Sequence, residues 1–315
     1  MAVPTTFRHE MLAYAGGTDG FVRETLTPVR EALAEDAGVL VAVEDGRARA
    51  LVQALEDDRE RERVRSVPMH ELGRNPSRML ALWQQFAREH AADGHGKALG
   101  IGEPVWPGRS AAELGECERH EALVNLAFDR GPGWRLLCVY DLEGLGQNVI
   151  DGARASHPWL CSGGSSATND GYAGAQDPPQ PFAGSLPDPQ AAVERLAFAG
   201  ETLGQMRHAL SAWARAQGMS VDGAEALVLA VNELAVNSVR HGGGAGTLLR
   251  WRENGELLCE VRDTGHIREP LTGRVRPAAD ACSGRGLWLA NQLCDLVQIR
   301  SAPAGSAVRV HKRLP

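Results

Sequence analysis

Residues 162–189 constrain the fold most, because they are crowded with glycine, serine and proline and show no hydrophobic period. Such a stretch cannot bury enough apolar surface to fold by itself. We therefore expect a flexible linker there. It separates a first domain over residues 1–161 from a second over residues 190–315, and both have an ordinary domain size.

Composition narrows the class of protein. The 315 residues carry a formal net charge of −7, 43% are hydrophobic and 23% are charged, which is typical of a globular protein. No window approaches a membrane span and the N-terminus lacks the pattern of an export signal, so we expect a cytoplasmic protein without a membrane partner. The acidic balance gives no electrostatic reason to expect direct nucleic-acid binding.

The six cysteines are scattered through the chain without a C-x-x-C pair. This spacing argues against a disulfide framework or a zinc cluster. We expect mostly reduced, partly buried thiols instead.

The first domain alternates strand-like and helix-like segments, which predicts an α/β fold. Strands are expected at 39–43 and 134–140, and helices at 46–65, 77–92, 111–128 and 144–155. Asp141 follows the second strand, at the carboxyl end where parallel strands often meet ligands, and His157 follows the last helix. Both are candidate site residues. In the alternative, Asp141 caps the next helix and His157 closes a turn before Pro158.

Four short segments resemble the sensory domain called MEDS, after methanogens and methylotrophs. They are R-H-E-M-L-A-Y (8–14), H-E-A-L-V-N-L-A-F (120–128), L-L-C-V-Y-D (136–141) and A-S-H-P (155–158). The resemblance implies a RecA-like α/β fold that senses a small molecule or a partner, often without a working phosphate loop. Here G-H-G-K-A at 94–98 lacks the earlier glycine and the following hydroxyl of such a loop. His9 and Tyr14 then join Asp141 and His157 as candidates for a sensory pocket, with ordinary packing as the alternative.

In the second domain, apolar residues recur at helical spacing from Ser220 to Gly246, which predicts one amphipathic helix. On it Glu233, Asn237 and His241 stand at i, i+4 and i+8, so a carboxylate, an amide and an imidazole share one face. A carboxylate that can accept a proton beside an amide oxygen that can bind Mg²⁺ suits phosphoryl transfer from ATP. The alternative is a solvated polar stripe.

The flanking segments predict helices packed against a sheet, an α+β two-layer sandwich. A helix is expected at 191–217 and strands at 247–252, 256–262 and 307–312. After the middle strand, Asp263 can accept a hydrogen bond from the exocyclic amine of adenine, and Gly265 allows a flat ring to approach. Such a D-x-G turn is weak evidence alone, because it is a common strand exit.

Residues 266–283 have the composition of a mobile lid, and a helix is expected directly after them. Gly284 and Gly286 stand at its start. Unpaired backbone N–H groups and the helix dipole attract phosphate at such a place.

The order of these pieces resembles the ATPase superfamily of gyrase, heat-shock chaperone, histidine kinases and mismatch-repair proteins (GHKL) over residues 191–315. E-L-A-V-N-S-V-R-H-G resembles its N box, D-T-G its first glycine box and G-R-G-L its second. The resemblance implies ATP and Mg²⁺ as cofactors. The roles it assigns are the base (Glu233), the Mg²⁺ ligand (Asn237), the adenine site (Asp263, Gly265) and the rest of the nucleotide site (His241, Gly284, Arg285, Gly286, Leu287).

Two positions depart from the family pattern. Ile267 replaces the second glycine of D-x-G-x-G, which puts the mobility of the lid in question. Ser306 stands where the last strand often carries threonine, which leaves its role beside adenine open.

Within the superfamily, the compact second domain resembles anti-sigma factor serine kinases. These sequester a sigma factor and phosphorylate a serine on a STAS-type anti-anti-sigma partner, and such domains are commonly dimers. The fusion to a sensory domain resembles actinobacterial regulators of the stress response. Two alternatives remain open. One is an ATP-gated sigma-binding module that transfers nothing, and the presence of Glu233 argues against it. The other is a sensor histidine kinase with His208 as acceptor, although no acidic residue follows that histidine.

Overall fold

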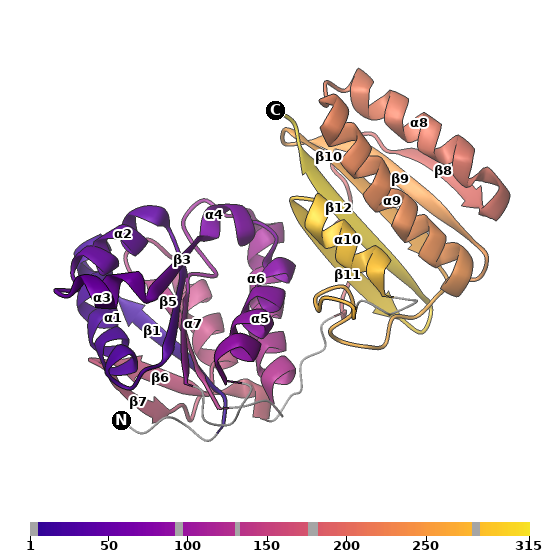
Figure 1. Ribbon diagram of the computed structural model, residues 1–315. Coiled ribbons are helices and arrows are strands. Elements are labelled where there is room, and N and C mark those ends of the chain that lie inside the picture. Colours follow the sequence, from indigo (N-terminus) through magenta and orange to yellow (C-terminus); the bar gives the residue numbers. More distant parts are fainter. Residues whose placement is uncertain (1–5, 92–96, 130–132, 176–181, 279–283) are drawn as a thin grey trace. The chain divides into compact units, whose positions relative to one another are not determined.

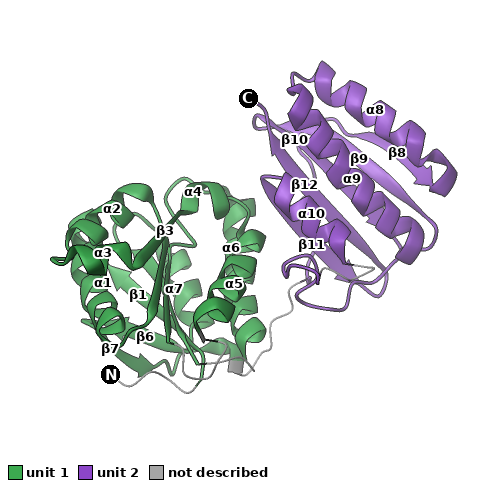
Figure 2. Cartoon of the chain, viewed as in Figure 1, with its two compact units in different colours: residues 1–179 green, residues 180–315 purple. Residues whose placement is uncertain are grey.

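The computed structural model describes residues 6–91, 97–129, 133–175, 182–278 and 284–315. The chain divides into two compact units, residues 1–179 and 180–315, which are treated separately below (Figure 2). Within the described residues, no helix combines the length and apolar character that a membrane span requires.

The first unit contains a seven-stranded sheet in the order β3-β2-β4-β5-β1-β6-β7. The strands β1 to β6 pair in parallel, and only β7 runs antiparallel to its neighbour β6. This confirms the predicted α/β class. The strands are β1 (Arg8–Tyr14), β2 (Gly38–Val43), β3 (Val64–Pro68), β4 (Ala98–Gly102), β5 (Arg135–Asp141), β6 (Trp159–Ser162) and β7 (Ser165–Thr168).

Helices cover both faces of this sheet (Figure 1). They are α1 (Gly17–Ala34), α2 (Asp45–Gln53), α3 (Asp58–Glu62), α4 (Met69–Leu72), α5 (Met79–Ala91), α6 (Ala111–Phe128) and α7 (Gln147–Ser156), with 3₁₀ turns at Pro76–Arg78 and Ala173–Ala175. Successive strand residues point to opposite faces, so Leu12 and Leu137 pack with α1 and α2. His9 is three positions before Leu12 and Cys138 is one position after Leu137, so both face away from that core, and they lie close to α6.

Two predictions for the first unit were wrong in part. The expected helix at 46–65 is two short helices, α2 and α3, followed by the start of β3. Asp57 caps α3 by accepting a bond from Arg59 N, and Val64 is buried where β3 joins the sheet.

The expected linker at 162–189 contains β7, which pairs with β6. Its last part belongs to the second unit, where Phe182 is buried and its carbonyl accepts a bond from Ser301 N.

The second unit is a two-layer α+β sandwich, as predicted. Its antiparallel sheet has the order β11-β12-β10-β9-β8, and the helices lie on one face (Figure 1). The strands are β8 (Glu194–Ala199), β9 (Ala245–Glu253), β10 (Glu256–Asp263), β11 (Leu296–Ala302) and β12 (Gly305–Arg313). The helices are α8 (Leu203–Ala216), α9 (Val221–His241) and α10 (Arg285–Leu293), with a 3₁₀ turn at Gly200–Thr202.

The helix expected at 191–217 was wrong over its first half. Residues 194–199 form the edge strand β8, because they pair with β9, and the helix starts only at Leu203. Phe198 on β8 is buried in the same core as the apolar residues of α8. The apolar residues of the strand and the helix therefore looked like one continuous helical pattern in the sequence. The strand β11 was not predicted.

The helix α9 positions the polar residues that follow. Ser220 caps it by accepting a bond from Gly223 N at 3.1 Å. Leu227, Val231 and Leu234 bury one face in the core, and Gly242 ends the helix. The opposite side is left to carry polar groups.

Candidate functional sites

The predicted polar face of α9 exists in the second unit. Glu233 and Asn237 are half-buried and His241 is exposed. The first turn of α10 lies directly against the first two. A Cβ atom placed on Gly286 would stand 3.0 Å from Asn237 Nδ2 and 3.1 Å from Glu233 Oε2. Only glycine therefore leaves these two side chains their present positions.

Asp263 ends β10 and is held by three donors. Its Oδ1 accepts from Gly265 N and from Ser306 Oγ, both at 2.8 Å, and its Oδ2 accepts from Ser238 Oγ at 2.5 Å. The pairing of β10 with β12 sets Ser306 directly opposite Asp263. Ser306, which stands where the family often has threonine, therefore helps to orient the Asp263 carboxylate.

The end of α9 meets the turn after Asp263 at close range. Thr264 donates to the carbonyl of Gly242 through its backbone N at 3.2 Å and its hydroxyl at 3.0 Å. A Cβ on Gly265 would stand 2.8 Å from the carbonyl oxygen of His241. A side chain at that position would push the turn away from the helix.

A cavity of about 420 Å³ lies between these elements. It is lined by six of the predicted nucleotide-site residues, Asn237, His241, Asp263, Gly265, Gly284 and Leu287, and also by Ser238 and Ser306. Glu233, Arg285 and Gly286 do not line it. Glu233 stays adjacent through its contact with α10. The carboxyl end of β10 and the polar face of α9 thus open on one space.

The glycine turn before α10 has the expected backbone form. Gly284 is the N-cap of the helix with φ of 83°, a left-handed conformation that favours glycine. Arg285 is exposed at the first position of the helix. The first turn leaves backbone N–H groups available to an anion.

Part of the predicted lid, residues 279–283, lies outside the described residues. The described part runs along the cavity, where His266, Ile267 and Glu269 are among the lining residues. Ile267 N donates to Ser301 Oγ at 2.8 Å. The residue that replaces the family's second glycine is therefore tied by its backbone to β11.

In the first unit, the four predicted pocket residues fall into two separate groups. Tyr14 and Asp141 end adjacent strands at the carboxyl edge of the sheet, where Arg47 lies over the Tyr14 ring and 3.8 Å from Asp141 Oδ2. Asp141 Oδ1 accepts from the backbone N of Glu143, so it stabilises the turn after β5. It does not cap the next helix as in the alternative, because the N-cap of α7 is Gly146. Burial raises the pKa of Tyr14, and the Glu103 carboxylate acts in the same direction.

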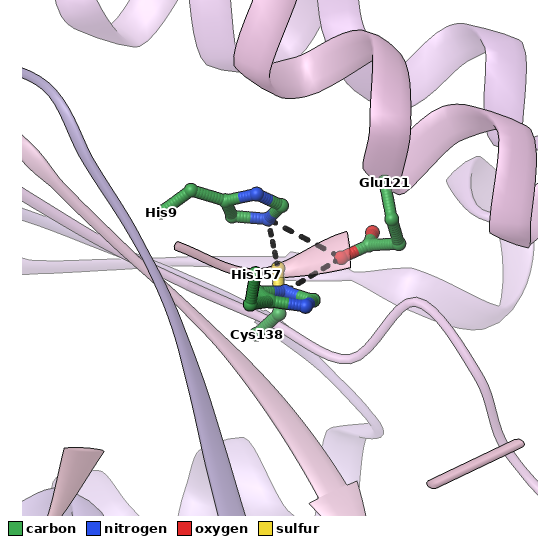
Figure 3. A group of neighbouring side chains, drawn as sticks. All are labelled: His9, Glu121, Cys138 and His157. Carbon is green, nitrogen blue, oxygen red and sulfur yellow. Dashed lines mark hydrogen bonds and ion pairs between the residues drawn. The ribbon is translucent and has the colours of Figure 1, made fainter. Parts of the chain in front are cut away.

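His9 and His157 belong to a buried polar cluster, which we define as His9, Glu121, Cys138 and His157 (Figure 3). The two imidazole rings are 3.9 Å apart. Their Nε2 atoms lie 3.2 Å and 2.9 Å from Glu121 Oε2, and His9 Nε2 lies 3.3 Å from Cys138 Sγ. Each of the four residues is at most 3% exposed.

Burial and the close contacts among the four residues together set the pKa values of this cluster. Burial lowers the pKa of His9, with His157 acting in the same direction, and it raises the pKa of the Cys138 thiol. Burial alone would raise the pKa of Glu121, but the adjacent His157 and His9 outweigh it and hold that pKa well below its usual range.

Sequence reasoning missed three residues at these sites. Ser238 lies on the apolar face of α9, one turn after Leu234. A polar residue at a position where the helical pattern expects an apolar one was the signal that could have identified it. Glu121 and Cys138 were quoted within longer motifs but not singled out. A buried thiol in the middle of an apolar strand gives no signal of its own.

A helical layer over an antiparallel sheet, with a cavity between an amide-bearing helix, an aspartate turn and a glycine-started helix, defines a domain of the histidine kinase-like ATPase class. The family model described as histidine kinase-like ATPase domain matches residues 196–312. The family model of the methanogen/methylotroph, DcmR sensory (MEDS) domain matches residues 8–158. The chain is therefore a MEDS domain followed by a histidine kinase-like ATPase domain.

Among solved structures, the chain matches the RsbU and RsbW domains of Rv1364c from Mycobacterium tuberculosis. The identity is 18% and the TM-score 0.29, and the match covers 38% of this chain and 32% of the other. The chain thus spans about a third of that structure. No curated protein matches the chain.

Proposed function

We propose that the protein is an anti-sigma regulatory factor whose second domain binds Mg·ATP, holds a sigma factor and phosphorylates a serine of a STAS-type anti-anti-sigma partner. The single observation that carries the proposal is the close approach of the first turn of α10, at Gly286, to both Glu233 and Asn237 beside the Asp263 cavity. It supports a site in which base, metal ligand and phosphate-binding helix start act on one nucleotide.

The residues fit ATP and Mg²⁺. The Asp263 carboxylate, oriented by Ser238 and Ser306, faces the cavity as an acceptor for the adenine amine. The Asn237 amide oxygen is a suitable Mg²⁺ ligand, and the N–H groups at the start of α10 suit the phosphates. Bound Mg²⁺ would neutralise charge on the transferred group.

The residue proposed for the chemistry is Glu233. Its carboxylate would take the proton from the partner's serine hydroxyl while the hydroxyl oxygen attacks the γ-phosphorus and ADP leaves. The product phosphoserine adds about −1.5 to −2 charges, which disfavours its stay beside an acidic residue. This gives a reason for the partner to dissociate after phosphorylation.

For the first domain we propose a sensory role in which a signal changes the output of the second. The supporting feature is a cavity of about 320 Å³ between α6 and α7 that Glu121 and Tyr140 line. Its volume suits a small molecule.

The test of the kinase is single-turnover transfer from radiolabelled ATP to candidate STAS-type proteins, with a parallel pull-down of the sigma factor. Glu233→Gln should lower transfer by about 10²–10⁴-fold, because a general base supplies about that factor, while nucleotide affinity is kept. Glu225→Gln is the matched control, since Glu225 is exposed on the same helix, and it should leave transfer unchanged.

Three outcomes separate the functions. An acid-stable label on the partner that depends on Glu233 supports the serine kinase. ATP-dependent retention of a sigma factor without transfer would replace it with the ATP-gated binding module. An acid-labile label on the chain itself, lost in His208→Ala, would replace it with the sensor histidine kinase.

A further inference from the structure

The buried polar cluster of the first domain brings four metal-ligand atoms to one point (Figure 3). His9 comes from β1, Cys138 from β5, Glu121 from α6, and His157 directly follows α7. One atom from each, two imidazole nitrogens, a thiol sulfur and a carboxylate oxygen, lie within 4.8 Å of one another. Elements distant in sequence thus converge on a space of the size of one ion.

The outer nitrogens of both imidazoles have fixed hydrogen-bond partners. Asn125 donates through Nδ2 to the carbonyl of Ser156 at 2.8 Å, so its Oδ1, 3.1 Å from His9 Nδ1, is the acceptor for that ring. His157 Nδ1 lies 2.7 Å from the carbonyl of Ala153, which can only accept. Both Nδ1 atoms therefore carry a proton, and in the neutral rings both Nε2 atoms present a lone pair inward.

These lone pairs converge on one carboxylate oxygen, Glu121 Oε2. A network of protons alone would have to place a proton between His157 Nε2 and Glu121 Oε2, which are 2.9 Å apart. Yet His157 Nε2 has no hydrogen bond of acceptable geometry, and a buried polar atom without an aligned partner is unfavourable. A cation between the four atoms removes this conflict, because each lone pair then points at positive charge.

The surroundings match those of metal-bound histidines. Such rings usually donate their second N–H to a carbonyl or carboxylate, which fixes the tautomer. Here the acceptors are the Asn125 amide and the Ala153 carbonyl. Zn–N bonds of about 2.0–2.1 Å and Zn–S bonds of about 2.3 Å separate tetrahedral ligands by about 3.3–3.6 Å. The three contacts at 2.9, 3.2 and 3.3 Å are within a few tenths of an ångström of that.

We propose that the first domain binds one divalent transition-metal ion of the Zn²⁺ type through His9 Nε2, Glu121 Oε2, Cys138 Sγ and His157 Nε2. The mixed nitrogen, sulfur and oxygen set suits Zn²⁺ or Co²⁺ and does not suit Mg²⁺ or Ca²⁺, which prefer oxygen ligands. Binding converts the Cys138 thiol to a thiolate and releases its proton to solvent. The ion would tie β1, β5, α6 and the end of α7 together.

The site also touches the small-molecule cavity of this domain. Glu121 lines that cavity together with Tyr140, whose hydroxyl donates to Glu121 Oε2 at 3.2 Å. Glu121 is thus the metal ligand that a molecule in the cavity reaches first.

The test uses the tag-free full chain, prepared without oxygen and without nucleotide. Zinc per chain is measured by mass spectrometry after dialysis, and Co²⁺ is added to the metal-free protein as an optical probe. We expect about one Zn²⁺ per chain and a Co²⁺ complex with the thiolate-to-metal absorption band and strong visible bands of a tetrahedral site. Mg²⁺ in excess should not displace Co²⁺.

Cys138→Ser should lose the thiolate band, whereas the matched control Cys161→Ser should keep it. Cys161 is a buried cysteine of β6 outside the cluster. Should Cys138→Ser fail to fold by circular dichroism, Asn125→Ala decides, because it leaves all four ligands in place. Loss of the bond that orients His9 should weaken Zn²⁺ binding by about 10–100-fold while the band persists.

Three results would overturn the proposal. The first is wild-type protein that takes up neither Zn²⁺ nor Co²⁺ at one per chain. The second is a thiolate band that survives in folded Cys138→Ser, and the third is a Zn²⁺ affinity that is unchanged in Asn125→Ala.

Discussion

The two domains assemble their polar sites from residues at very different distances along the chain. In the ATPase domain, α9 alone supplies Glu233, Asn237 and His241, and Asp263 with its glycine turn follows on β10. In the MEDS domain, contacts within the buried polar cluster join His9 to Cys138, which is 129 positions away. The first kind of site is encoded by local periodicity, and the second by the order of strands in a sheet.

The difference also appears in exposure. The candidate ATPase site opens on a cavity and keeps His241 exposed, which suits the proposed exchange of a nucleotide. The buried polar cluster is closed, with each member at most 3% exposed. An open site depends on individual side chains for affinity, whereas a closed one depends on the packing of the whole domain around it. The experiments below test how far the open site and its surroundings depend on individual side chains, from the largest expected effect to the smallest.

Asn237→Ala should weaken Mg·ATP binding at least about tenfold, a loss of about 1.4 kcal/mol, because a methyl group cannot replace an amide oxygen on the metal. Isothermal calorimetry with Mg²⁺ and with a chelator measures it. The matched control is Asn232→Ala on the same helix, where the side chain accepts a bond from Arg207 at 3.0 Å. Equal Mg·ATP affinity in Asn237→Ala and wild type would show that the polar face of α9 does not hold the metal.

Asp263→Asn should reduce the preference for ATP over GTP by about tenfold. The amide cannot accept from all of Ser238, Ser306 and Gly265 and still face the adenine amine, and a hydrogen bond to a charged group contributes about 1.5–3 kcal/mol. Competition between the two nucleotides measures the ratio, with Asp222→Asn at the start of α9 as control. An unchanged ratio would remove Asp263 from the base-binding part of the site.

The placement of side chains in the candidate ATPase site could be predicted because its signals are local. The Ser220 cap, the apolar period and Gly242 define α9 within a residue or two, and spacing on one helix fixes which side chains share a face. The strand β8 was misread as helix, because a short apolar run fits both periods until its pairing with β9 is known. Ser238 was missed because its partner Asp263 lies on another element.

The buried polar cluster could be predicted only in part. His9 and His157 were singled out by resemblance, whereas Glu121 and Cys138 became visible once β1 and β5 were seen as neighbours under α6. The cysteine spacing argued against a zinc cluster. The absence of a C-x-x-C pair excludes only zinc sites that are built from pairs of cysteines. It gives no information on a site that contains a single cysteine. Topology, which the sequence pattern did not determine, supplies the missing information.

Gly286→Ala should have a smaller effect than either substitution above. The new methyl would stand 3.0 Å from Asn237 Nδ2 and 3.1 Å from Glu233 Oε2, so both side chains must shift, at a cost of about 1 kcal/mol in unfolding free energy. ATP affinity should fall along with it. The control is Gly204→Ala in α8, whose nearest atom would be Arg207 Nη2 at 3.8 Å, and which should be neutral or stabilise by up to about 1 kcal/mol. Thermal unfolding and calorimetry are the measurements, and equal behaviour of the two variants would contradict the close approach of α10 to α9.

The smallest expected effect concerns acid stability at the far end of β10, away from the cavity. Burial alone would raise the pKa of Glu256, but His311 at 2.9 Å and Arg313 at 3.2 Å outweigh it and lower that pKa. The folded carboxyl therefore releases its proton more readily than the unfolded one, whose pKa is about 4.3. Its stabilisation is fully present above about pH 4.3 and is lost as the pH falls through the lowered folded value.

Glu256→Gln should accordingly flatten the loss of stability below about pH 4.3, by less than about 1 kcal/mol because the side chain is partly exposed. Hydrogen exchange of β10 and β12 peptides between pH 3 and pH 7 follows this part of the ATPase domain directly, with Glu225→Gln as control. Equal steepness in Glu256→Gln and wild type would mean that the pair with His311 adds nothing to acid stability. A flatter curve would show that the end of β10 far from the cavity sets part of the pH range over which the domain is stable, independently of the residues on α9.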